Sequence, residues 1–381
     1  MHQQQDRYFV VTHPGFEQIC AHELSAAGIQ PVATTRGGVE FDGGLRELYL
    51  ANLWLRTASR ILVRLGEVTA RDFPTLFQRL ARLPWGRFIK SGIGCDIRAS
   101  ASGSRLTHTG RIAETCGAAI ARALGEEQIP CQQKGGQKIF LRLHADRCLV
   151  SVDSSGDHLH RRGYLKARGA APLRETLAAG CLLAVNYDGS RPLIDLMTGS
   201  GTLAIEAAMI ALCRAPGRER SFAFMQWPKF RRGLWDQLLV AARREEKSLL
   251  PAPILGVDNN PKAIAAARQN LEDAGLAGLV QLNCANMQQL AGQSPPGLLI
   301  CNPPYGGRLG KNASLRALYG DLGRVYGVRF NVWQGLLICP EGELLRATGC
   351  VFRPLIRFSN GGIPVALLEK SDELSTPSET S

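Results

Sequence analysis

The residues best suited to chemistry are Asn302, Pro303, Pro304 and Tyr305, which directly follow the apolar run Leu298–Cys301. Proline has no backbone N–H group, so this stretch offers carbonyl acceptors with few competing donors. Asn302 adds a side-chain carbonyl, and an exocyclic –NH₂ group donates two protons, so the stretch is suited to receive such an amine. Tyr305 supplies a flat ring against which an extruded base can stack. We predict that these four residues are catalytic; a plain turn is the alternative.

A second motif lies upstream, where the short apolar run Leu193–Leu196 leads into a glycine-rich turn. Gly199 and Gly201 let the backbone turn tightly and approach a ligand, because neither carries a Cβ atom. A predicted helix begins at Thr202 and directs its first N–H groups toward the same place. This arrangement is typical of a nucleotide-type cofactor site, although a strand-to-helix turn without a ligand would have the same sequence.

A third motif is an acid at the end of a strand, Asp258 after Ile254–Val257. A dinucleotide site would have a third glycine three residues after Gly201, where this chain has Ala204. Asp258 is well placed to accept hydrogen bonds from two ribose hydroxyls. It could instead cap the helix predicted over residues 261–274. Taken together, the second and third motifs favour the adenosine half of a methyl donor over a nicotinamide dinucleotide.

The three motifs resemble those of Rossmann-like amino-methyltransferases that use S-adenosyl-L-methionine (SAM). The matching residues are 195–202 (DLMTGSGT), 254–260 (ILGVDNN) and 302–305 (NPPY). Two upstream stretches, HRRGY at 160–164 and APLRETLAA at 171–179, narrow the resemblance to the bacterial RlmL-type enzymes. These are large-subunit (23S) ribosomal RNA guanine-N2 methyltransferases with a THUMP domain, and the resemblance covers nearly the whole chain.

The resemblance implies a role for each motif. Residues 199–202 would line the methionine part of SAM, Asp258 would hold its ribose, and residues 302–305 would hold the target amine. Asn286 stands where relatives usually carry an acid that binds the adenine amine, and its amide oxygen can still accept. The implied cofactor-binding residues are Asp195, Thr198, Gly199, Ser200, Gly201, Thr202, Asp258, Asn259 and Asn286.

The resemblance also implies a domain organisation. We expect an N-terminal ferredoxin-like domain at 1–68, a THUMP RNA-binding domain at 69–165 and a SAM-dependent methyltransferase domain at 166–370. Residues 371–381 are rich in Ser, Thr, Pro and Glu and are predicted to be disordered. Longer enzymes of this type carry a second methyltransferase domain behind the first. This chain ends without one, so we expect a single methyltransferase activity here.

Hydrophobic patterning supports an α/β fold that would position these motifs. The N-terminal part predicts two small α+β modules, and the part after residue 163 alternates strands with helices, which is typical of a parallel sheet. The predicted strands are 8–12, 38–41, 61–68, 94–100, 138–144, 148–153, 193–196, 254–257 and 298–301. The predicted helices are 16–27, 45–53, 73–83, 109–123, 171–184, 202–212 and 261–274.

Composition points to a polyanionic partner. The 381 residues carry a formal charge of +12, divided equally between residues 1–165 and 166–381. Such an excess favours a phosphate-rich polyanion, because each neutralised phosphate releases counterions and adds affinity. The resemblance implies that this partner is 23S rRNA or a ribosome assembly intermediate, and we predict no obligate protein partner.

The 11 cysteines form no CxxC pair or ligand cluster, so no metal is expected. A signal peptide and an 18-residue apolar stretch are lacking, which predicts a cytoplasmic protein without a membrane span.

Residues 214–232 mix basic and aromatic side chains, and two interpretations stay open. Arginines for phosphates and aromatic rings for unstacked bases are what single-stranded RNA requires. An ordinary insertion whose rings pack on a domain core would have the same composition. The aromatic residues are Phe222, Phe224, Trp227 and Phe230.

Three other functions share part of this evidence. An adenine-N6 DNA methyltransferase would use the same Asn-Pro-Pro-Tyr chemistry, but the N-terminal modules resemble an RNA-binding platform. A THUMP-type tRNA guanine-N2 methyltransferase would differ only in its RNA. A nucleic-acid-binding protein with an inactive catalytic fold is disfavoured, because all three motifs are intact.

Overall fold

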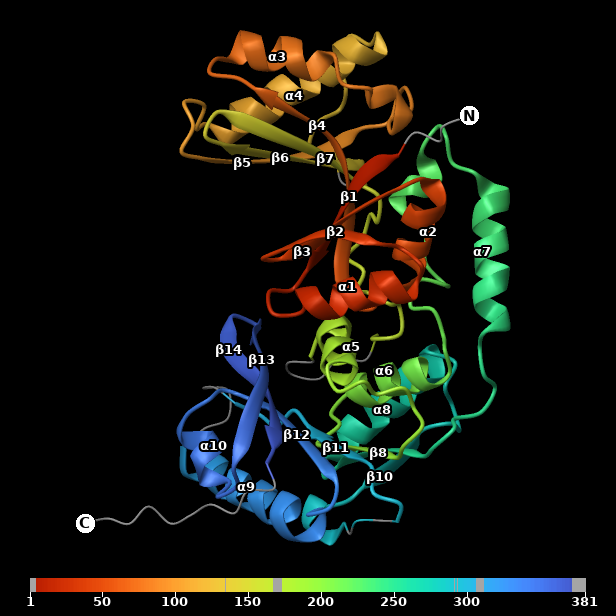
Figure 1. Ribbon diagram of the computed structural model, residues 1–381, viewed down its shortest axis with the longest axis vertical. Helices are drawn as coiled ribbons and strands as arrows, with labels where there is room; N and C mark the ends of the chain where they lie inside the picture. The colour runs from red at the N-terminus through yellow and green to blue at the C-terminus, as the bar shows by residue number, and fades with distance from the viewer. Residues whose placement is uncertain are drawn as a thin grey trace, which may run out of the picture. The chain divides into compact units, whose positions relative to one another are not determined.

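The computed structural model describes residues 5–133, 135–166, 173–290, 292, 294–305 and 312–371. The chain forms two compact units (Figure 1). The first unit contains residues up to Thr12, Cys20–Leu159 and Gly217–Ala241, and the second contains His13–Ile19, His160–Pro216 and residues from Ala242 onward. The predicted methyltransferase segment therefore includes 25 residues, 217–241, that fold with the first unit.

The first unit is built on one seven-stranded sheet in the order β2-β3-β1-β4-β7-β6-β5. Buried and more exposed side chains alternate along part of this sheet, as where Ile139, Leu141 and Leu143 are buried and Arg142 is exposed. The strands are β1 (Asp6–Thr12), β2 (Pro31–Thr35), β3 (Gly38–Gly43), β4 (Ala58–Thr69), β5 (Cys95–Ser102), β6 (Gln137–His144) and β7 (Arg147–Asp153). The helices are α1 (Glu17–Ala26), α2 (Leu45–Trp54), α3 (Phe73–Ala81) and α4 (Thr109–Leu124).

The long strand β4 joins the two modules that we expected in this half of the chain. It pairs antiparallel with β1 on one side and with β7 on the other. A bulge between Arg64 and Gly66 shifts its register with β7. The boundary predicted after residue 68 thus lies at the end of a strand inside one continuous sheet.

The second unit contains a seven-stranded sheet in the order β10-β9-β8-β11-β12-β14-β13. Strands β10 to β12 are parallel, which confirms the predicted parallel sheet, and β14 and β13 add an antiparallel end that the sequence did not predict. The strands are β8 (Leu193–Leu196), β9 (Ile254–Asp258), β10 (Gln281–Cys284), β11 (Leu298–Cys301), β12 (Gln334–Cys339), β13 (Phe352–Asn360) and β14 (Ile363–Lys370). The helices are α5 (Glu175–Leu183), α6 (Thr202–Ala211), α8 (Pro261–Asp273), α9 (Asn312–Arg324) and α10 (Glu343–Ala347), while α7 (Arg232–Arg244) runs from one unit into the other.

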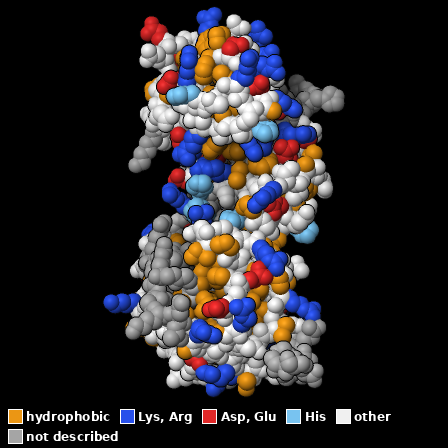
Figure 2. Space-filling model, turned by 90° about the vertical axis from the view of Figure 1, so that its left-hand side faces the viewer, with side chains coloured by type: hydrophobic (Ala, Val, Ile, Leu, Met, Phe, Trp, Pro, Cys, Tyr) orange, Lys and Arg blue, Asp and Glu red, His pale blue; other side chains and the backbone are white. Residues whose placement is uncertain are grey.

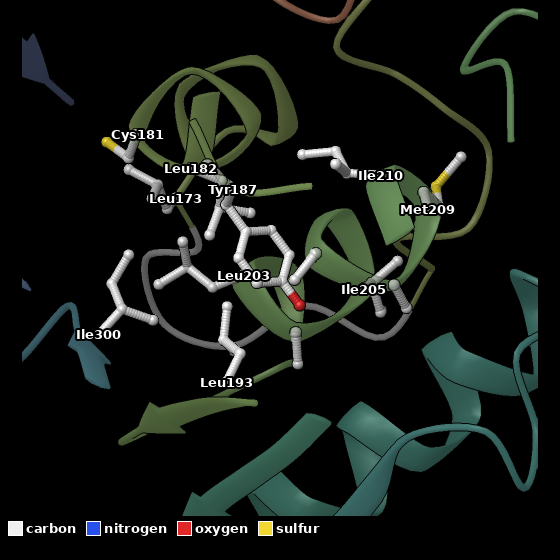
Figure 3. Packing of buried hydrophobic residues seen from close by; sticks show 14 of the residues in the cluster. Leu173, Cys181, Leu182, Tyr187, Leu193, Leu203, Ile205, Met209, Ile210 and Ile300 are labelled. Carbon is white, nitrogen blue, oxygen red and sulfur yellow. The ribbon is translucent and has the colours of Figure 1, made fainter. Parts of the chain in front are cut away.

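The core of the second unit lies on both faces of β8 and β11, whose residues are all buried. Leu193 and Ile300 point to the face covered by α5 and α6 (Figure 3). Ile194 and Leu299 point to the opposite face, against α9. This two-sided burial explains the continuous apolar runs that predicted these strands. Helix α5 begins at Glu175 and not at the predicted residue 171; residues 171 and 172 lie outside the described part of the chain.

The aromatic residues of the 214–232 segment pack inside the first unit. Phe224 is fully buried and stacks on Tyr49 of α2, with ring centroids 4.4 Å apart. Trp227 is buried and its Nε1 donates a hydrogen bond to Gln137 Oε1 (2.8 Å). Phe222 is also buried. Of the two interpretations, core packing is therefore confirmed for these three rings, which have no free face for an RNA base.

No helix among the residues that the structure describes is both long enough and apolar enough to span a membrane.

Candidate active site

The strand register brings the three motifs to one edge of the second sheet. Leu196 at the end of β8 pairs with Val257 of β9 and with Cys301 of β11. Because the three strands are parallel, the residues that follow them emerge side by side at their carboxyl ends. Ligands of open α/β sheets bind at this edge. The loop after β8, Asp258 and the stretch after Cys301 therefore form one site.

The loop between β8 and α6 is held in a tight, left-handed backbone path. Met197, Gly199 and Gly201 have φ angles of 59°, 55° and 87°. Such angles are easy for glycine and strained for Met197, which is the kind of strain that concentrates at functional loops. A Cβ atom at Gly201 would lie 3.2 Å from the Cβ of Ala267 in α8, whereas one at Gly199 would only make an ordinary contact with the Met197 carbonyl oxygen, at 3.9 Å. Gly201 thus permits close helix packing, and Gly199 leaves room for a ligand.

Asp195 holds this loop through a hydrogen bond to Thr198. It is buried on β8, and its Oδ2 accepts a hydrogen bond from Thr198 Oγ1 (2.6 Å). Burial raises the pKa of Asp195 to about 7, and the negative charge of Asp258 also raises it, while the Thr198 hydroxyl and the Ala204 amide lower it. A buried carboxylate at this position favours a positively charged ligand nearby.

Asp258 has one hydrogen bond on each carboxylate oxygen. Oδ2 accepts from the Gly199 amide (3.0 Å), and Oδ1 accepts from the Asn260 amide (2.9 Å). The cap of α8 is Asn260, whose Oδ1 accepts from the Lys262 amide, so the alternative role of Asp258 as a helix cap is wrong. Each carboxylate oxygen has a further lone pair, which leaves Asp258 able to accept two ribose hydroxyls. Asn259 is exposed beside it.

Asn286 lies next to this acid, because the Ala285 amide donates to the Asp258 carbonyl (3.1 Å). Its side chain is exposed, and its Oδ1 accepts from the Gln288 amide (3.1 Å), which caps the 3₁₀ turn Met287–Gln289. The oxygen that we expected to accept the adenine amine thus already accepts one hydrogen bond. One lone pair of that oxygen remains for a ligand.

The stretch from Asn302 to Tyr305 emerges beside the loop after β8. Pro303 is buried, and the other three residues are half-buried. The Oδ1 atom of Asn302 is inaccessible to water and has no hydrogen-bond partner among the described residues. Buried polar atoms are nearly always paired, and leaving one unpaired is costly. This acceptor therefore indicates a place for a donor that a bound substrate would bring.

Two tyrosines and an asparagine complete this end of the site. Asn360 at the end of β13 donates from Nδ2 to the Tyr305 hydroxyl (2.7 Å). Burial raises the pKa of Tyr305, and this hydrogen bond lowers it. The buried Tyr319 of α9 donates to the Pro304 carbonyl at the longer distance of 3.5 Å. Asn360 and Tyr319 were not predicted to belong to the site, since nothing local in the sequence marks them.

One further residue that the sequence did not indicate supports the cofactor loop. Asn270 of α8 is fully buried, and its Nδ2 donates to the Ser200 carbonyl (2.9 Å). This bond ties the glycine turn to the helix that Gly201 packs against. The loop residues Thr198 to Thr202 are thus fixed from two sides, by Asp195 and by α8. The room beside Gly199 and the spare acceptors of Asp258 fit an adenosine cofactor.

Family models agree with these motifs. A model described as the RMKL-like methyltransferase domain matches residues 162–348, and a model described as the RlmL ferredoxin-like domain matches residues 7–62. A *Synechocystis* protein named "Putative RNA methyltransferase slr0064" is 32% identical over 95% of this chain and 96% of its own length. Ribosomal RNA large subunit methyltransferase K/L of *Syntrophotalea carbinolica* is 37% identical over 95% of this chain. The chain spans 53% of that relative, or about half its length.

Solved structures agree as well. The crystal structure of SMU.472 complexed with S-adenosylhomocysteine (SAH) has a TM-score of 0.86 and 28% sequence identity, covering 97% of this chain and 98% of that chain. The Rossmann-like fold class predicted from the motifs is therefore confirmed, as is the resemblance to the RlmL-type enzymes. Because a relative is 32% identical over 95% of this chain and family models match residues 7–62 and 162–348, the chain belongs to the RlmKL-like methyltransferase family.

Proposed function

We propose that this protein transfers a methyl group from SAM to the exocyclic N2 amine of a guanine in 23S rRNA. The observation that carries the proposal is the buried Oδ1 of Asn302, which has no hydrogen-bond partner within the described part of the chain and lies beside the loop after β8. An exocyclic amine can donate a hydrogen bond to this oxygen. Family membership supports the methyl transfer, and the names of the K/L relatives support the choice of ribosomal RNA.

The chain's own residues provide a mechanism without a strong base. A guanine amine has its lone pair delocalised into the ring. When Asn302 Oδ1 and the Pro303 carbonyl accept its two N–H bonds, the lone pair is drawn out of conjugation and made available for attack. Tyr305 stacks on the base and sets its plane. Bound SAM supplies an electrophilic methyl group. The main contributions are positioning and preorganised dipoles, and the proton leaves afterwards to water.

Residues of the site hold the two reactants at one edge of the sheet. Gly199 to Thr202 would line the methionine part of the cofactor, Asp258 its ribose, and Asn286 its adenine. In its ionised form, the buried Asp195 would favour the positively charged SAM over SAH, whose sulfur carries no charge.

The N-terminal half would hold the RNA. We assign residues 1–68 to a ferredoxin-like domain, 69–165 to a THUMP domain and 166–370 to the catalytic domain, with the sheet of the first unit shared by the first two. In Figure 2, Lys and Arg side chains lie around exposed hydrophobic ones on the viewed face. Free 23S rRNA and a ribosome precursor both fit such a surface. We place the reaction in the cytoplasm, where either is made.

The test is methyl transfer from labelled SAM to total RNA from a strain that lacks this gene, followed by digestion to nucleosides. Wild type is compared with Asn302→Ala and with Asn331→Ala, an exposed asparagine that serves as the matched control. We expect label in N2-methylguanosine of 23S rRNA. We expect Asn302→Ala to lose most activity and still bind SAM, and Asn331→Ala to keep both.

Other outcomes separate the alternatives. Label in N2-methylguanosine of tRNA would support the proposed reaction but show that the substrate is tRNA and not 23S rRNA. Label in N6-methyladenine of DNA, tested with the same variants, would favour the DNA methyltransferase. Full activity of Asn302→Ala would contradict the role given to its side chain.

A further inference from the structure

The turn between β13 and β14 lies against the residues that would hold the target base. Asn360 ends β13, and its side chain donates the 2.7 Å hydrogen bond to the Tyr305 hydroxyl. Gly361 and Gly362 follow with φ angles of 60° and 86°, which is a two-residue hairpin turn that favours glycine. Asn360 pairs with Ile363 across this turn. The hairpin register thus fixes where Asn360 lies.

An aromatic contact inside the same unit anchors the strand that carries Asn360. Phe358 is buried, and its ring centroid lies 5.2 Å from that of Phe16. The Phe16 ring packs directly on α5, because a Cβ atom at Gly180 would lie 2.5 Å from it. Phe358 and Asn360 are two residues apart, so they lie on the same face of β13. The strand is therefore held by its aromatic residue while the next side chain on that face contacts Tyr305.

We propose that Asn360 is a positioning residue that fixes the ring plane of Tyr305 for stacking on the target base. The proposal rests on the function proposed above. Tyr305 is half-buried and contacts the core on both faces of the sheet, and Asn360 supplies the hydrogen bond that holds its hydroxyl end. Two acceptors at Asn302 and Pro303 can bind both N–H groups only if the base plane is held within about 10–20°. A fixed ring provides that plane before the base arrives.

A double-mutant cycle tests the coupling. The single-turnover rate of RNA methylation is measured for wild type, Asn360→Ala, Tyr305→Phe and the double variant, with Ser359→Ala as the control on the same strand. Each of the two single variants removes one hydrogen bond and should lower the rate roughly two- to ten-fold. The double variant should be no slower than either single variant, because both remove the same interaction. Losses that multiply, or a single variant at the wild-type rate, would overturn the proposal.

A second measurement examines the pair without any substrate. The ¹³Cζ resonance of Tyr305, assigned with Tyr305→Phe, should shift in Asn360→Ala and stay in place in Ser359→Ala. An unchanged resonance in Asn360→Ala would contradict the hydrogen bond. A wild-type protein that methylates no RNA would overturn the proposed function and the base-positioning role together, even where the resonance shift establishes the Asn360–Tyr305 pair. The two failures are thus distinguishable.

Discussion

Two aromatic regions of this molecule look alike in sequence and differ in structure. Residues 222–235 and residues 302–305 both combine aromatic rings with polar groups, so the sequence alone makes both of them candidates for contact with an RNA base. In the first region Phe224 is fully buried and stacks on Tyr49. In the second, Tyr305 is half-buried and lies at the carboxyl edge of the parallel strands, close to Asn302, whose Oδ1 has no partner among the residues that the structure describes.

The difference teaches that position relative to a strand indicates function better than composition does. Phenylalanine and tryptophan suit a core as well as they suit a base, so a basic aromatic stretch leaves both possibilities open. A motif that directly follows a buried parallel strand is different, because the strand carries it to the edge where ligands bind. Residues 302–305 have that context, and residues 222–235 follow no such strand.

The largest expected difference between the two regions is the effect of Phe224 on stability. We expect Phe224→Ala to lower the free energy of unfolding by about 3–5 kcal/mol, because it removes a fully buried ring from the core of the first unit. The measurement is denaturant unfolding, with the half-buried Phe230→Ala as a control that should lose less. A variant with unchanged stability and weakened RNA binding would return this segment to the RNA-binding surface.

The pH dependence of stability should also differ between the two regions. The catalytic unit contains a buried carboxyl group that titrates, whereas the 222–235 cluster consists of aromatic rings. The pKa of Asp195 is about 7 in the folded protein and roughly 3.9 in an unfolded chain. The folded state therefore binds the proton of the Asp195 carboxyl group more tightly than the unfolded chain does. Protonation stabilises the fold fully below about pH 4, and this stabilisation is lost as the pH rises to 7.

We expect wild type to lose about 1.4 kcal/mol of unfolding free energy per pH unit relative to Asp195→Asn in that window. Denaturant unfolding at a series of pH values measures the difference. Asp236→Asn, which removes an exposed carboxylate, is the matched control and should follow wild type. Parallel profiles for wild type and Asp195→Asn would show that Asp195 stays charged throughout.

Tyr305 gives the opposite signature to Phe224. Base–aromatic stacking contributes about 1–3 kcal/mol, so Tyr305→Ala should lower kcat/KM for RNA roughly 10- to 100-fold. Because the ring is half-buried, its loss should disturb stability less than the loss of Phe224 does. Tyr305→Phe keeps the ring and loses only the hydrogen bond to Asn360, so it should lower the rate only roughly two- to ten-fold. If Tyr305→Ala mainly unfolds the protein, the tyrosine belongs to the core, as Phe224 does.

The smallest expected effects compare two glycines. Gly201→Ala places a Cβ atom on a residue with φ of 87° and 3.2 Å from Ala267, so it should cost about 1–3 kcal/mol and weaken SAM binding. Gly233→Ala in α7 meets nothing within 4 Å and should stabilise the protein by at most about 1 kcal/mol. Unfolding and SAM titration of both variants test this, and equal behaviour would remove the special role of the loop backbone.

The sequence was sufficient for the parts of the site that are determined locally. Each motif follows a short buried strand, β8, β9 or β11, and parallel register then brings the strand ends together. The antiparallel end of the sheet was missed. Strand β13 is largely exposed and lacks a clear alternation of buried and exposed side chains, so hydrophobic periodicity does not mark it.

The supporting partners were also out of reach from sequence. Asn270 is 70 residues from the carbonyl of Ser200 that it binds, and Asn360 is 55 residues from Tyr305. Single asparagines at such separations have no local pattern. Whether Asp258 caps α8 was open for a similar reason, since aspartate and asparagine both cap helices and only the backbone geometry shows that Asn260 is the cap.

The interleaving of the two units has a consequence for biosynthesis. The sheet of the first unit is complete in sequence once β7 has been made, yet Phe224, Trp227 and Trp235, which cover Tyr49 and Gln137, come from residues 217–241. A nascent chain must therefore carry the glycine loop and α6 out of the ribosome before its N-terminal core can close. Until then Tyr49 lacks its stacking partner, so folding of the first unit is expected to wait for synthesis of part of the second.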